Sequence, residues 1–446
     1  MDFDIPSGAE HILQSLTAAG YDANFVGGCV RDLLRGAAPH DWDICTSARP
    51  EETAACFPDC RIINTGLRHG TVTVLTGGQL YEITTYRTEG PYSDSRRPDF
   101  VRYVTDLQQD LARRDFTMNA IALGPDGALR DPFRGADDIK AGLIRCVGDP
   151  ACRFQEDGLR IMRALRFAAV FGYRIDGPTS RAIHDHRAVL DRVAAERIQA
   201  ELCKLLAGRS AGDILRQYSD VLFQFWPELE PLTTLAQNNP WHCWNGWEHT
   251  LHALEAAPSH PSVRLAVLLH DIGKPRCQST DEAGIDHFYG HPAVSAELAE
   301  TLLRRLRFGR AAIKRVVTLV EYHDTPLPRD GRGIRHWLNR LDPETFFQLL
   351  EVKRADMLGQ APEKAAARLE EWNHIKAEAE QIIAKRQILT LKDLAVNGGD
   401  VIAAGINPGP AVGRILEQLL ERVLSGELPN RREILLEEIE QEASGS

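Results

Sequence analysis

The sequence lacks any long hydrophobic run. No apolar stretch approaches the roughly 20 residues that a membrane-spanning helix needs, so we expect no membrane span. The first residues, MDFDIPSGAEHIL, are acidic and contain no basic segment followed by an apolar one. We therefore expect a soluble chain without a secretion signal.

Closely spaced cysteine pairs are also missing. The nine cysteines include no C-x-x-C pair, and the closest two, Cys56 and Cys60, lie around a Pro-Asp turn. Such a scattered set is typical of buried or unreactive thiols in a reducing cytosol. The expected location is therefore the cytoplasm.

A surplus of positive charge is absent as well. The chain has 52 Lys and Arg against 63 Asp and Glu, and its net charge is −11. This balance excludes attraction of nucleic acid over the whole surface, but it is compatible with a local basic groove.

The chain is long, and its character changes along its length. A chain of 446 residues exceeds one compact core, which predicts two to four domains. Strand-like and helical runs rich in glycine fill residues 1–150, whereas almost everything after Gln155 has helical spacing. Residues 71–75 and 80–86 alternate in polarity around Gly77-Gly78, which predicts a β-hairpin.

Two adjacent glycines stand where a predicted strand ends and a helix begins. Gly27 and Gly28 follow the strand end at Phe25-Val26, and Arg31 lies one turn into the helix. Glycines let the backbone approach a triphosphate closely, and a helix N-terminus offers free N–H groups. Taken alone, the pattern is most often a plain turn, so it predicts phosphate binding only in combination with other motifs.

Two carboxylates follow ten residues later, in the segment HDWDI. In an extended strand, Asp41 and Asp43 face one side while Trp42 and Ile44 point into the core. Neighbouring carboxylates repel each other unless a cation lies between them, and a divalent metal such as Mg²⁺ supplies that charge. A lone D-x-D is most often a surface turn, but with the glycine turn it predicts a metal-dependent phosphoryl-transfer centre. Glu82 is either a third carboxylate or an exposed strand residue.

Four ordered motifs resemble those of one family. They are G-G-x-V-R-D at 27–32, D-x-D at 41–43, R-R-D-F-T-M-N-A at 113–120 and E-D-x-x-R at 156–160. With these motifs the chain resembles the bacterial class II tRNA nucleotidyltransferases, which include CCA-adding enzymes and bacterial poly(A) polymerases. The resemblance implies a head with a polymerase-β-like palm.

The resemblance also implies a role for each motif of the head. Asp41 and Asp43 would be the catalytic carboxylates and the Mg²⁺ ligands. Paired guanidinium groups suit a triphosphate because arginine forms forked, charge-assisted bonds, although a solvated Arg-Arg pair is the plain alternative. The nucleotide-binding residues implied in the head are Gly27, Gly28, Arg31, Arg113, Arg114, Asp115 and Asn119.

A helix predicted over residues 156–169 carries a polar stripe of Asp157, Arg160, Arg163 and Arg166. An intrahelical salt-bridge ladder is the simplest explanation of such a stripe. However, cytosine and adenine both present an amino donor beside a ring-nitrogen acceptor, so an Asp acceptor beside an Arg donor pairs with them and rejects guanine and uracil. The resemblance implies that Asp157 and Arg160 select CTP and ATP in this way, while Arg163 and Arg166 donate further bonds to the nucleotide.

Two segments narrow the activity within the family. Poly(A) polymerases of the family typically carry a G-R/K-R/K-F segment before the hairpin, whereas residues 64–74 read NTGLRHGTVTV and resemble the CCA-adding version. Residues 87–102 are polar and interrupted by prolines, which predicts a loop. The resemblance implies that CC-only enzymes lack an intact loop here, so its presence favours addition of the final A. An A-adding enzyme keeps the same motifs and stays an alternative.

A second constellation lies in the helical part of the chain. Residues 267–274 read VLLHDIGK, the signature of the HD phosphohydrolase superfamily, and K-R-A-D at 353–356 resembles its closing aspartate. Such a donor set suits a transition metal or Mg²⁺, and the implied reaction is hydrolysis of a phosphomonoester or a 2′,3′-cyclic phosphate. The alternative is a degenerate domain that keeps its ligands for structure. The implied metal ligands are His249, His270, Asp271, His291, His323 and Asp356, of which His291 and His323 permit a second metal.

The last segment combines a Gly-Pro-rich stretch at 405–413 with helical spacing at 416–423. It resembles the family's tail, which grips the tRNA elbow. A helical hairpin that caps the preceding domain is the alternative. Lys and Arg are sparse here, which predicts few phosphate contacts.

Together these patterns predict an α/β head with a polymerase-β-like palm, followed by an all-α neck, HD body and tail. The expected domains are the head at 1–150, the neck with the nucleotide-reading helix at 151–240, the HD domain at 241–385 and a tRNA-binding tail at 386–446. The predicted activity is untemplated addition of CMP, CMP and AMP from CTP and ATP to the tRNA 3′ end, with release of pyrophosphate. The alternatives are an A-adding or poly(A) polymerase and, from another class, an HD phosphohydrolase whose head serves recognition.

Overall fold

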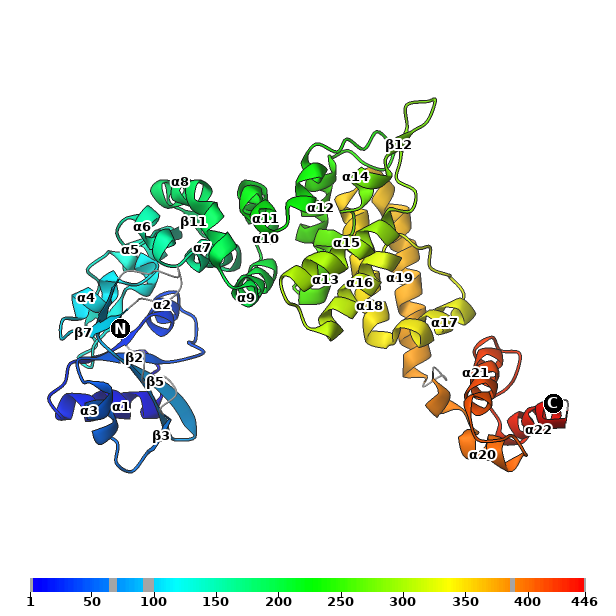
Figure 1. The fold of residues 1–446 in the computed structure, drawn as a ribbon, viewed down its shortest axis with the longest axis horizontal. Coiled ribbons are helices and arrows are strands. Elements are labelled where there is room, and N and C mark those ends of the chain that lie inside the picture. Colours follow the sequence, from blue (N-terminus) through cyan, green and yellow to red (C-terminus); the bar gives the residue numbers. More distant parts are fainter. Residues whose placement is uncertain (1–2, 64–69, 91–99, 386–389, 445–446) are drawn as a thin grey trace. The chain divides into compact units, whose positions relative to one another are not determined.

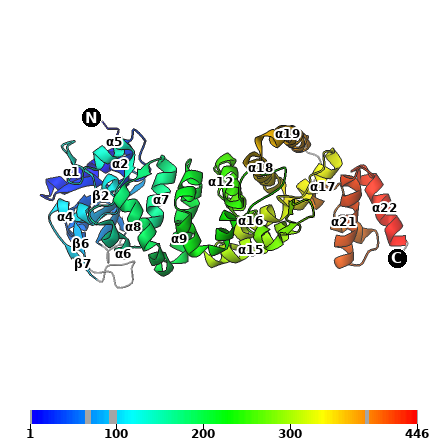
Figure 2. The same cartoon turned by 90° about the horizontal axis from the view of Figure 1, so that it is seen from above.

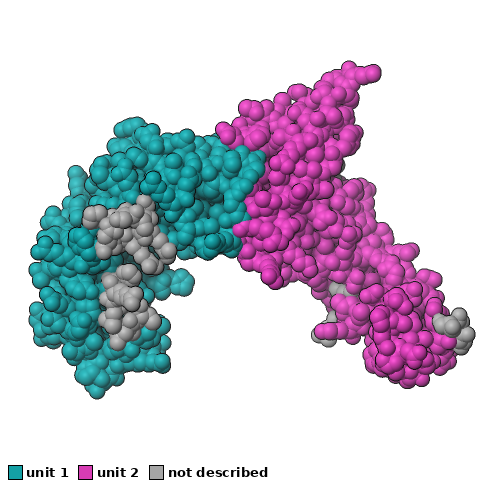
Figure 3. Space-filling view, viewed as in Figure 1, with its two compact units in different colours: residues 1–228, 305–307 teal, residues 229–304, 308–446 magenta. Residues whose placement is uncertain are grey.

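The computed structural model describes residues 3–63, 70–90, 100–385 and 390–444. The chain divides into two compact units, which are coloured separately in Figure 3 and traced in Figure 1: residues 1–228 with 305–307, and residues 229–304 with 308–446. Among the described residues, no helix is long and apolar enough to cross a membrane. The nine cysteines are all free thiols.

The first unit contains a seven-stranded mixed sheet with the order β3-β4-β5-β2-β1-β8-β9. The β2–β5 pair is parallel, and the other neighbouring strands of this sheet are antiparallel. The elements of this part are α1 (Ser7–Ala18), β1 (Ala23–Val26), α2 (Gly28–Leu34), β2 (Asp43–Thr46), α3 (Pro50–Ala55), β3 (Arg61–Ile63), β4 (Thr71–Thr76), β5 (Gln79–Thr85), β6 (Arg87–Glu89), β7 (Val101–Tyr103), α4 (Leu107–Ala112), η2 (Thr117–Asn119), β8 (Ala122–Leu123), β9 (Leu129–Arg130), α5 (Gly135–Ala141) and β10 (Leu143–Ile144).

The predicted hairpin is confirmed. β4 pairs antiparallel with β5 around Gly77 and Gly78, which both have positive φ. Its alternating pattern buries Val72, Val74 and Tyr81, which places one face of the hairpin in the core. Residues 64–69 and 91–99 of the segments that narrowed the activity lie outside the described residues. The prediction of a loop over the whole of 87–102 is wrong at its two ends, because β6 pairs there antiparallel with β7.

The central strands bring the acidic motif into the middle of the sheet. Ile44 of β2 is fully buried, and Trp42 packs edge-on against Phe25 of β1 with 5.1 Å between ring centroids. The prediction that both aspartates lie on one strand is wrong in one respect: β2 begins at Asp43, and Asp41 lies in the bend before it. The two aspartates therefore differ in backbone conformation. Trp42, which lies between them in the sequence, is buried and anchors the segment.

The rest of the first unit is mainly helical, and its helices α7 and α9 carry residues of the candidate nucleotide site. α7 packs against α9, and Figure 2 shows them as neighbours. The prediction of one continuous helix over 156–169 is wrong, because Asp157 has an extended backbone (φ −140°, ψ 104°) that separates α6 from α7. The elements here are α6 (Pro150–Glu156), α7 (Leu159–Phe171), β11 (Arg174–Ile175), α8 (Gly177–His186), η3 (Arg187–Arg192), α9 (Ala195–Leu206), α10 (Ala211–Gln217) and α11 (Ser219–Phe225), and η4 (Pro227–Thr233) leads into the second unit.

The second unit is helical apart from one short hairpin. Its helices α12, α13, α16 and α18 pack on one another around a core that includes Leu251, Leu268, Leu319 and Phe346. The elements are α12 (Gly246–Ala256), α13 (Pro261–Leu269), α14 (Lys274–Cys277), β12 (Ser279–Thr280), β13 (Asp286–His287), α15 (His291–Arg305), α16 (Arg310–Tyr322), α17 (Gly331–Leu341), α18 (Pro343–Gly359) and α19 (Pro362–Ala384).

The C-terminal helices have a small core of their own. It is built from apolar side chains of α20–α22, including Val401, Leu419, Leu435 and Ile439. The predicted helical spacing at 416–423 is confirmed by α21. The elements are η5 (Leu391–Asp393), α20 (Gly398–Ala403), α21 (Pro410–Leu424) and α22 (Arg432–Ser444).

Candidate nucleotide and metal sites

The glycine turn of the head lies directly against the acidic motif. Gly27 has φ +78°, in the left-handed region that favours glycine. A Cβ atom at Gly27 would lie 3.1 Å from Arg114 Nη1 and 3.7 Å from Asp43 Oδ2. The turn therefore needs glycine for two reasons, its backbone conformation and the close approach of a guanidinium and a carboxylate.

Asp43 lies in a cluster of negative charge. Because β2 and β5 are parallel and Asp43 is in register with Glu82, the two side chains lie on the same face of the sheet. Burial raises the pKa of Asp43, and the charges of Glu82 and Asp41 raise it further. Arg114 and, more weakly, Arg31 oppose this shift. A divalent cation fits this donor set, because it would relieve the repulsion among the three carboxylates.

Arg113 and Arg114 are held by a buried carboxylate that the motif analysis did not identify. Asp110, within α4, is fully buried and accepts hydrogen bonds from Arg113 Nε at 2.9 Å and from Arg114 Nη2 at 3.3 Å. Burial would raise the pKa of Asp110, but the two guanidinium charges outweigh it and lower the pKa. Arg113 also donates to Glu89 at 3.1 Å. The Arg-Arg pair is therefore fixed by ion pairs, and a freely solvated pair is ruled out.

A second hydrogen-bonded chain connects the glycine turn to the helical neck. Arg31 donates to Asn119 Oδ1 at 2.9 Å, and Asn119 donates to Asp115 Oδ1 at 2.9 Å. The other oxygen of Asp115 accepts two bonds from Arg163 at 2.8 and 2.6 Å. Burial would raise the pKa of Asp115, but Arg163 and Asn119 overcome it and lower the pKa to about 2. Four residues predicted from separate motifs thus form one network.

The two predicted base-reading residues make different contacts from those expected on a single helix. Asp157 accepts a two-pronged ion pair from Arg197 of α9, at 3.1 and 2.8 Å. Arg160 is buried, and it donates to Glu156 at 2.6 Å and to the backbone carbonyls of Arg153 and Arg113, each at 3.1 Å. The i,i+3 side-chain geometry predicted for these residues is therefore wrong, because Asp157 precedes the first turn of α7.

Helix α9 contributes a second charged residue to the same region. Glu201, 6% exposed, lies 3.0 Å from Arg166 Nε and 4.0 Å from Arg163 Nη1. Arg166 also stacks over the ring of Phe167, 3.9 Å from its centroid. Sequence reasoning missed Arg197 and Glu201, although their i,i+4 spacing on an amphipathic helix was a readable signal of a charged pair facing inward.

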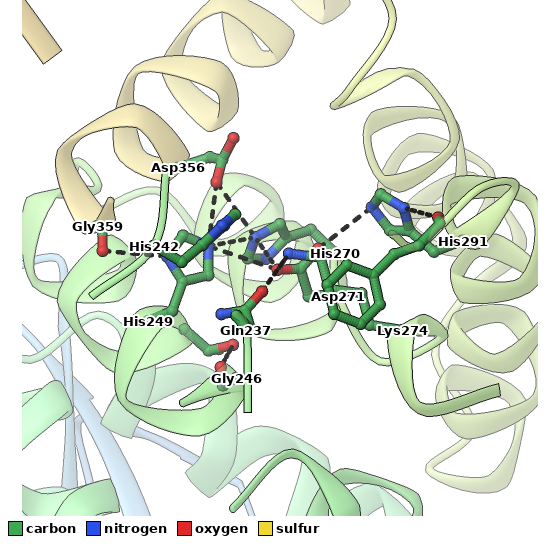
Figure 4. Close-up of polar contacts among 12 residues, drawn as sticks. Gln237, His242, Gly246, His249, His270, Asp271, Lys274, His291, Asp356 and Gly359 are labelled. Carbon is green, nitrogen blue, oxygen red and sulfur yellow. Dashed lines mark hydrogen bonds and ion pairs between the residues drawn. The ribbon is translucent and has the colours of Figure 1, made fainter. Parts of the chain in front are cut away.

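The six residues predicted as ligands in the helical body come together in one buried cluster, of which Figure 4 labels all but His323. Each lies on or next to the end of a different helix, except for the adjacent His270 and Asp271 after α13. Every histidine of the cluster turns its Nδ1 towards a backbone carbonyl 2.7–3.0 Å away: His249 towards Gly359, His270 towards Val267, His291 towards Phe288 and His323 towards Val320. A carbonyl only accepts, so each Nδ1 carries the hydrogen and each neutral ring presents a lone pair at Nε2.

The Nε2 atoms of these histidines converge in two pairs. His249 and His270 are 3.2 Å apart at Nε2, and so are His291 and His323. Two lone pairs that face each other at this distance repel, so each pair needs a proton or a metal ion between its members. The cluster thus contains two positions that favour a cation.

Asp271 lies between the two histidine pairs. Its Oδ2 is 3.4 and 3.2 Å from Nε2 of His249 and His270, and its Oδ1 is 3.3 and 3.7 Å from Nε2 of His291 and His323. Two sets of three ligand atoms, each within 4.8 Å of one another, share this carboxylate: His249, His270 and Asp271, and Asp271, His291 and His323. The nitrogen and carboxylate donors fit a divalent transition metal in each set.

Asp356 completes the first set from α18. Its Oδ1 lies 3.0 Å from His249 Nε2 and 3.6 Å from His270 Nε2. Burial opposes the charged form of His270, but Asp271 and Asp356 together raise its pKa to about 10. The carboxylates therefore attract positive charge to the centre of the cluster, as a proton or as a metal.

Four neighbours complete the surroundings of this cluster, and the HD motif alone identified none of them as functional. Lys274 lies 2.6 Å from Asp271 Oδ2 and donates to Gln237 at 2.8 Å. Gln360 donates to both oxygens of Asp356, at 3.1 and 3.3 Å. His242 lines the adjoining pocket of about 250 Å³ together with Lys274, Tyr289 and Gln360. A pocket of this kind beside the cluster gives a small ligand access to it.

Three family profiles match this chain. The profile described as "Poly A polymerase head domain" matches residues 23–145, and "Probable RNA and SrmB-binding site of polymerase A" matches residues 172–232. A third, described as tRNA nucleotidyltransferase domain 2, matches residues 280–439.

Full-length relatives and solved structures are also similar. The CCA-adding enzyme of Limosilactobacillus reuteri is 36% identical over 439 residues, covering 97% of this chain and 96% of the relative. That of Lactiplantibacillus plantarum is 35% identical, covering 96% and 94%. The crystal structure of the Bacillus stearothermophilus CCA-adding enzyme with CTP matches with a TM-score of 0.72 at 30% identity, covering 98% of this chain and 97% of that one. The Thermotoga maritima enzyme complexed with tRNA shares the fold, with a TM-score of 0.60 at 22% identity and coverage of 98% and 95%.

Proposed function

The chain belongs to the CCA-adding enzyme family, and we propose that it adds CMP, CMP and AMP in sequence to the 3′ end of tRNA. The substrates are CTP and ATP, and no nucleic-acid template is used. The observation that carries the proposal is the joint position of Gly27, Arg114 and Asp43: a Cβ atom at Gly27 would lie 3.1 Å from Arg114 Nη1 and 3.7 Å from Asp43 Oδ2, within residues 23–145 that match the head profile.

The reaction is an in-line transfer at the α-phosphate. The tRNA 3′-hydroxyl loses its proton to solvent and its oxygen forms a bond to the α-phosphorus. The bond to the bridging oxygen of the β-phosphate breaks, and pyrophosphate leaves with that electron pair. Asp41 and Asp43 would hold Mg²⁺, which when bound would supply charge neutralisation for this transfer. Arg114 lies beside the glycine turn, where its guanidinium neutralises phosphate charge, and Asp110 holds it there.

Selection of C and A is assigned to the polar residues of the neck. We propose that Asp157 and Arg160 pair with the base and that Arg163 and Arg166 contact the nucleotide. Arg197 pairs with Asp157, and Glu201 lies beside Arg163 and Arg166. Arg197 and Glu201 are therefore positioning residues for the side chains proposed to contact the nucleotide. The alternative of an A-adding or poly(A) polymerase shares these motifs and differs in its use of CTP.

For the body we propose an HD-type centre with metal-dependent phosphohydrolase activity. The support is the convergence of four histidine Nε2 atoms on Asp271, each ring being oriented by a carbonyl at Nδ1. A bound divalent metal would supply an activated water for hydrolysis of a phosphomonoester or a 2′,3′-cyclic phosphate. His249, His270, Asp271 and Asp356 would hold one ion, and His291 and His323 a second one that shares Asp271.

The remaining assignments follow from the substrate. The domain limits at 1–150, 151–240, 241–385 and 386–446 remain our proposal, and the tail is proposed to bind tRNA. A cytoplasmic location is also part of our proposal, because it suits processing of tRNA 3′ ends.

The test is incubation of the full chain with tRNAs that end before, within and after the CC sequence, each with a single NTP or with pairs of NTPs. Growth that requires CTP and stops after one A is expected. Long A tails would support the poly(A) polymerase instead, and addition of A without any use of CTP would support the A-adding alternative.

A further inference from the structure

One aromatic ring in the neck is surrounded by arginines that the proposed function assigns to the nucleotide. The ring belongs to Phe167 of α7, which is 5% exposed. The guanidinium carbons of Arg166, Arg31 and Arg163 lie 3.9, 5.1 and 5.4 Å from its centroid. All three distances are within the roughly 6 Å over which a cation is attracted to the face of a ring. No role in the reaction has been assigned to Phe167 itself.

The spacing of residues on α7 explains how the neck contributes to this arrangement. Arg163, Phe167 and Phe171 follow one another at i, i+4 and i+8, so they lie on one face of the helix. The rings of Phe167 and Phe171 are stacked, with 5.5 Å between their centroids and 20° between their planes. Arg31 of α2 lies 5.1 Å from both centroids, and Arg35, at the end of α2, lies 3.7 Å from that of Phe171. The helix that follows the glycine turn therefore meets α7 through guanidinium groups stacked on rings.

Phe167 also packs against the R-R-D-F-T-M-N-A motif of the head. Phe116 of that motif is fully buried, and its ring meets that of Phe167 edge-on, with 5.9 Å between centroids. Asp115, the residue before Phe116, accepts both bonds from Arg163. The ring of Phe167 is therefore in contact with two segments of the head as well as with its own helix.

The contacts of the guanidinium groups with the ring are largely shielded from water. The side chains of Arg31 and Arg166 are 12% and 14% exposed. An attraction between a cation and a ring is stronger in such a desolvated position than on an open surface. Asp32 and Glu201 form ion pairs with the two arginines. A carboxylate restrains the edge of a guanidinium group, whereas a ring restrains its face, so the two contacts together fix its orientation.

We propose that Phe167 is a positioning residue for nucleotide addition, which holds Arg31, Arg163 and Arg166 in the orientation that binds the incoming nucleotide. The inference rests on the proposed function, because that function assigns these arginines to the nucleotide. It goes beyond the function in one respect: the arginine that follows the glycine turn and the two arginines of the neck share a single support.

The test is steady-state addition of CMP and AMP to tRNA by the Phe167→Leu variant, which keeps an apolar side chain but removes the ring. The KM values for CTP and ATP should both rise about 10-fold, because contacts in a desolvated site are lost. The kcat should stay within about threefold, since these contacts bind the ground state and the transition state alike. The preference for CTP over UTP should stay within about twofold, because base selection is assigned to Asp157 and Arg160.

Two further variants separate positioning from a loss of packing. Phe167→Tyr keeps the ring, so its KM should stay within about threefold of the wild-type value. Phe57→Leu is the matched control, because it removes a ring that is 3% exposed elsewhere in the head. It should lower the melting temperature as Phe167→Leu does and leave KM unchanged. In an Arg166→Gln background, Phe167→Leu should raise KM less than in the wild type, because one of the supported groups is already missing.

An unchanged KM in Phe167→Leu would overturn the inference, and so would an equal rise in Phe57→Leu. Additive effects of Phe167→Leu and Arg166→Gln would also overturn it, as would a Phe167→Tyr variant with a KM as high as that of Phe167→Leu. A wild-type protein that adds no CMP to tRNA would instead overturn the proposed function.

Discussion

The two proposed cation sites, one in the head and one in the body, are built differently. In the head, Asp43 is half-buried, and Asp41 and Glu82 are exposed. Because the other charged side chains around Asp43 are arginines, the protein offers few atoms there that could bind a metal. In the body, four histidines and two aspartates are all at least nine-tenths buried and converge within hydrogen-bonding distance. An open carboxylate site must complete the metal's shell with substrate phosphates, whereas the body cluster offers more protein ligands and would leave a position for water. On our proposal, a metal arrives with each nucleotide in the head, and a metal stays bound in the body.

The largest effect that separates the two centres is expected from Asp43→Asn. The change keeps the side-chain shape but removes a negative charge next to Arg114, so nucleotide addition should fall about 1,000-fold or more. Metal binding and hydrolysis by the body should stay within about twofold, because the variant leaves the His-Asp cluster untouched. Single-turnover CMP addition to tRNA measures the first effect. Asp59→Asn, an exposed aspartate of the head, is the control, and residual addition above one-tenth would contradict the assignment of Asp43.

The reciprocal change, His270→Asn, tests whether the body centre is independent. It removes one ligand of a buried set, so metal retention and phosphate-ester hydrolysis should fall by about 100-fold. CMP addition should be unchanged within about twofold. Metal analysis after desalting and a chromogenic phosphodiester assay give the two readouts, with the exposed His374→Asn as the control. If both His270→Asn and Asp43→Asn abolish addition, the picture of two separate centres is wrong.

A smaller effect is expected from Arg197→Ala in the neck, which tests the proposed base-reading residues. Loss of the two-pronged ion pair frees Asp157, so preference for CTP over UTP should fall about 10-fold or more, mainly through KM. Arg197→Lys should restore little of it, because an ammonium cannot form the forked bond. Misincorporation of UMP on tRNA measures the change, and the exposed Arg181→Ala on α8 is the control. Unchanged selectivity would mean that Arg197 serves stability alone.

The smallest effect is expected from chelation. A resident metal at about 100 times its dissociation constant stabilises a fold by about 2.7 kcal/mol, which corresponds to a melting shift of roughly 5–10 °C in a domain of this size. Removal with EDTA should therefore lower the melting temperature of the wild type but not that of His270→Asn. An identical shift in both would place the stabilising metal outside the body cluster.

Much of both sites could be predicted from the sequence because their motifs are local. The glycine turn and the residues of R-R-D-F-T-M-N-A lie where strands and short turns place them, and buried Trp42 and Ile44 fix the strand next to the aspartates. His270 and Asp271 at the end of α13 were readable for the same reason, since they belong to the short signature VLLHDIGK. What local pattern could not show was the break at Asp157, because helical spacing continues through it. The break leaves Gly158 so close to Val189 that a Cβ would lie 2.9 Å from its Cγ2, a contact made across 31 residues.

By itself, the sequence determined which residue types carry the chemistry: two spaced carboxylates behind a glycine turn, a polar stripe in the neck, and six His and Asp donors in a helical body. Only the tertiary structure decided which of them touch. It paired Asp157 with Arg197 and Arg166 with Glu201, and it oriented His249 by the Gly359 carbonyl at Nδ1. Those partners come from other helices and loops, and packing of buried surfaces, rather than spacing along the chain, selects which side chains meet in a dry, low-dielectric interior.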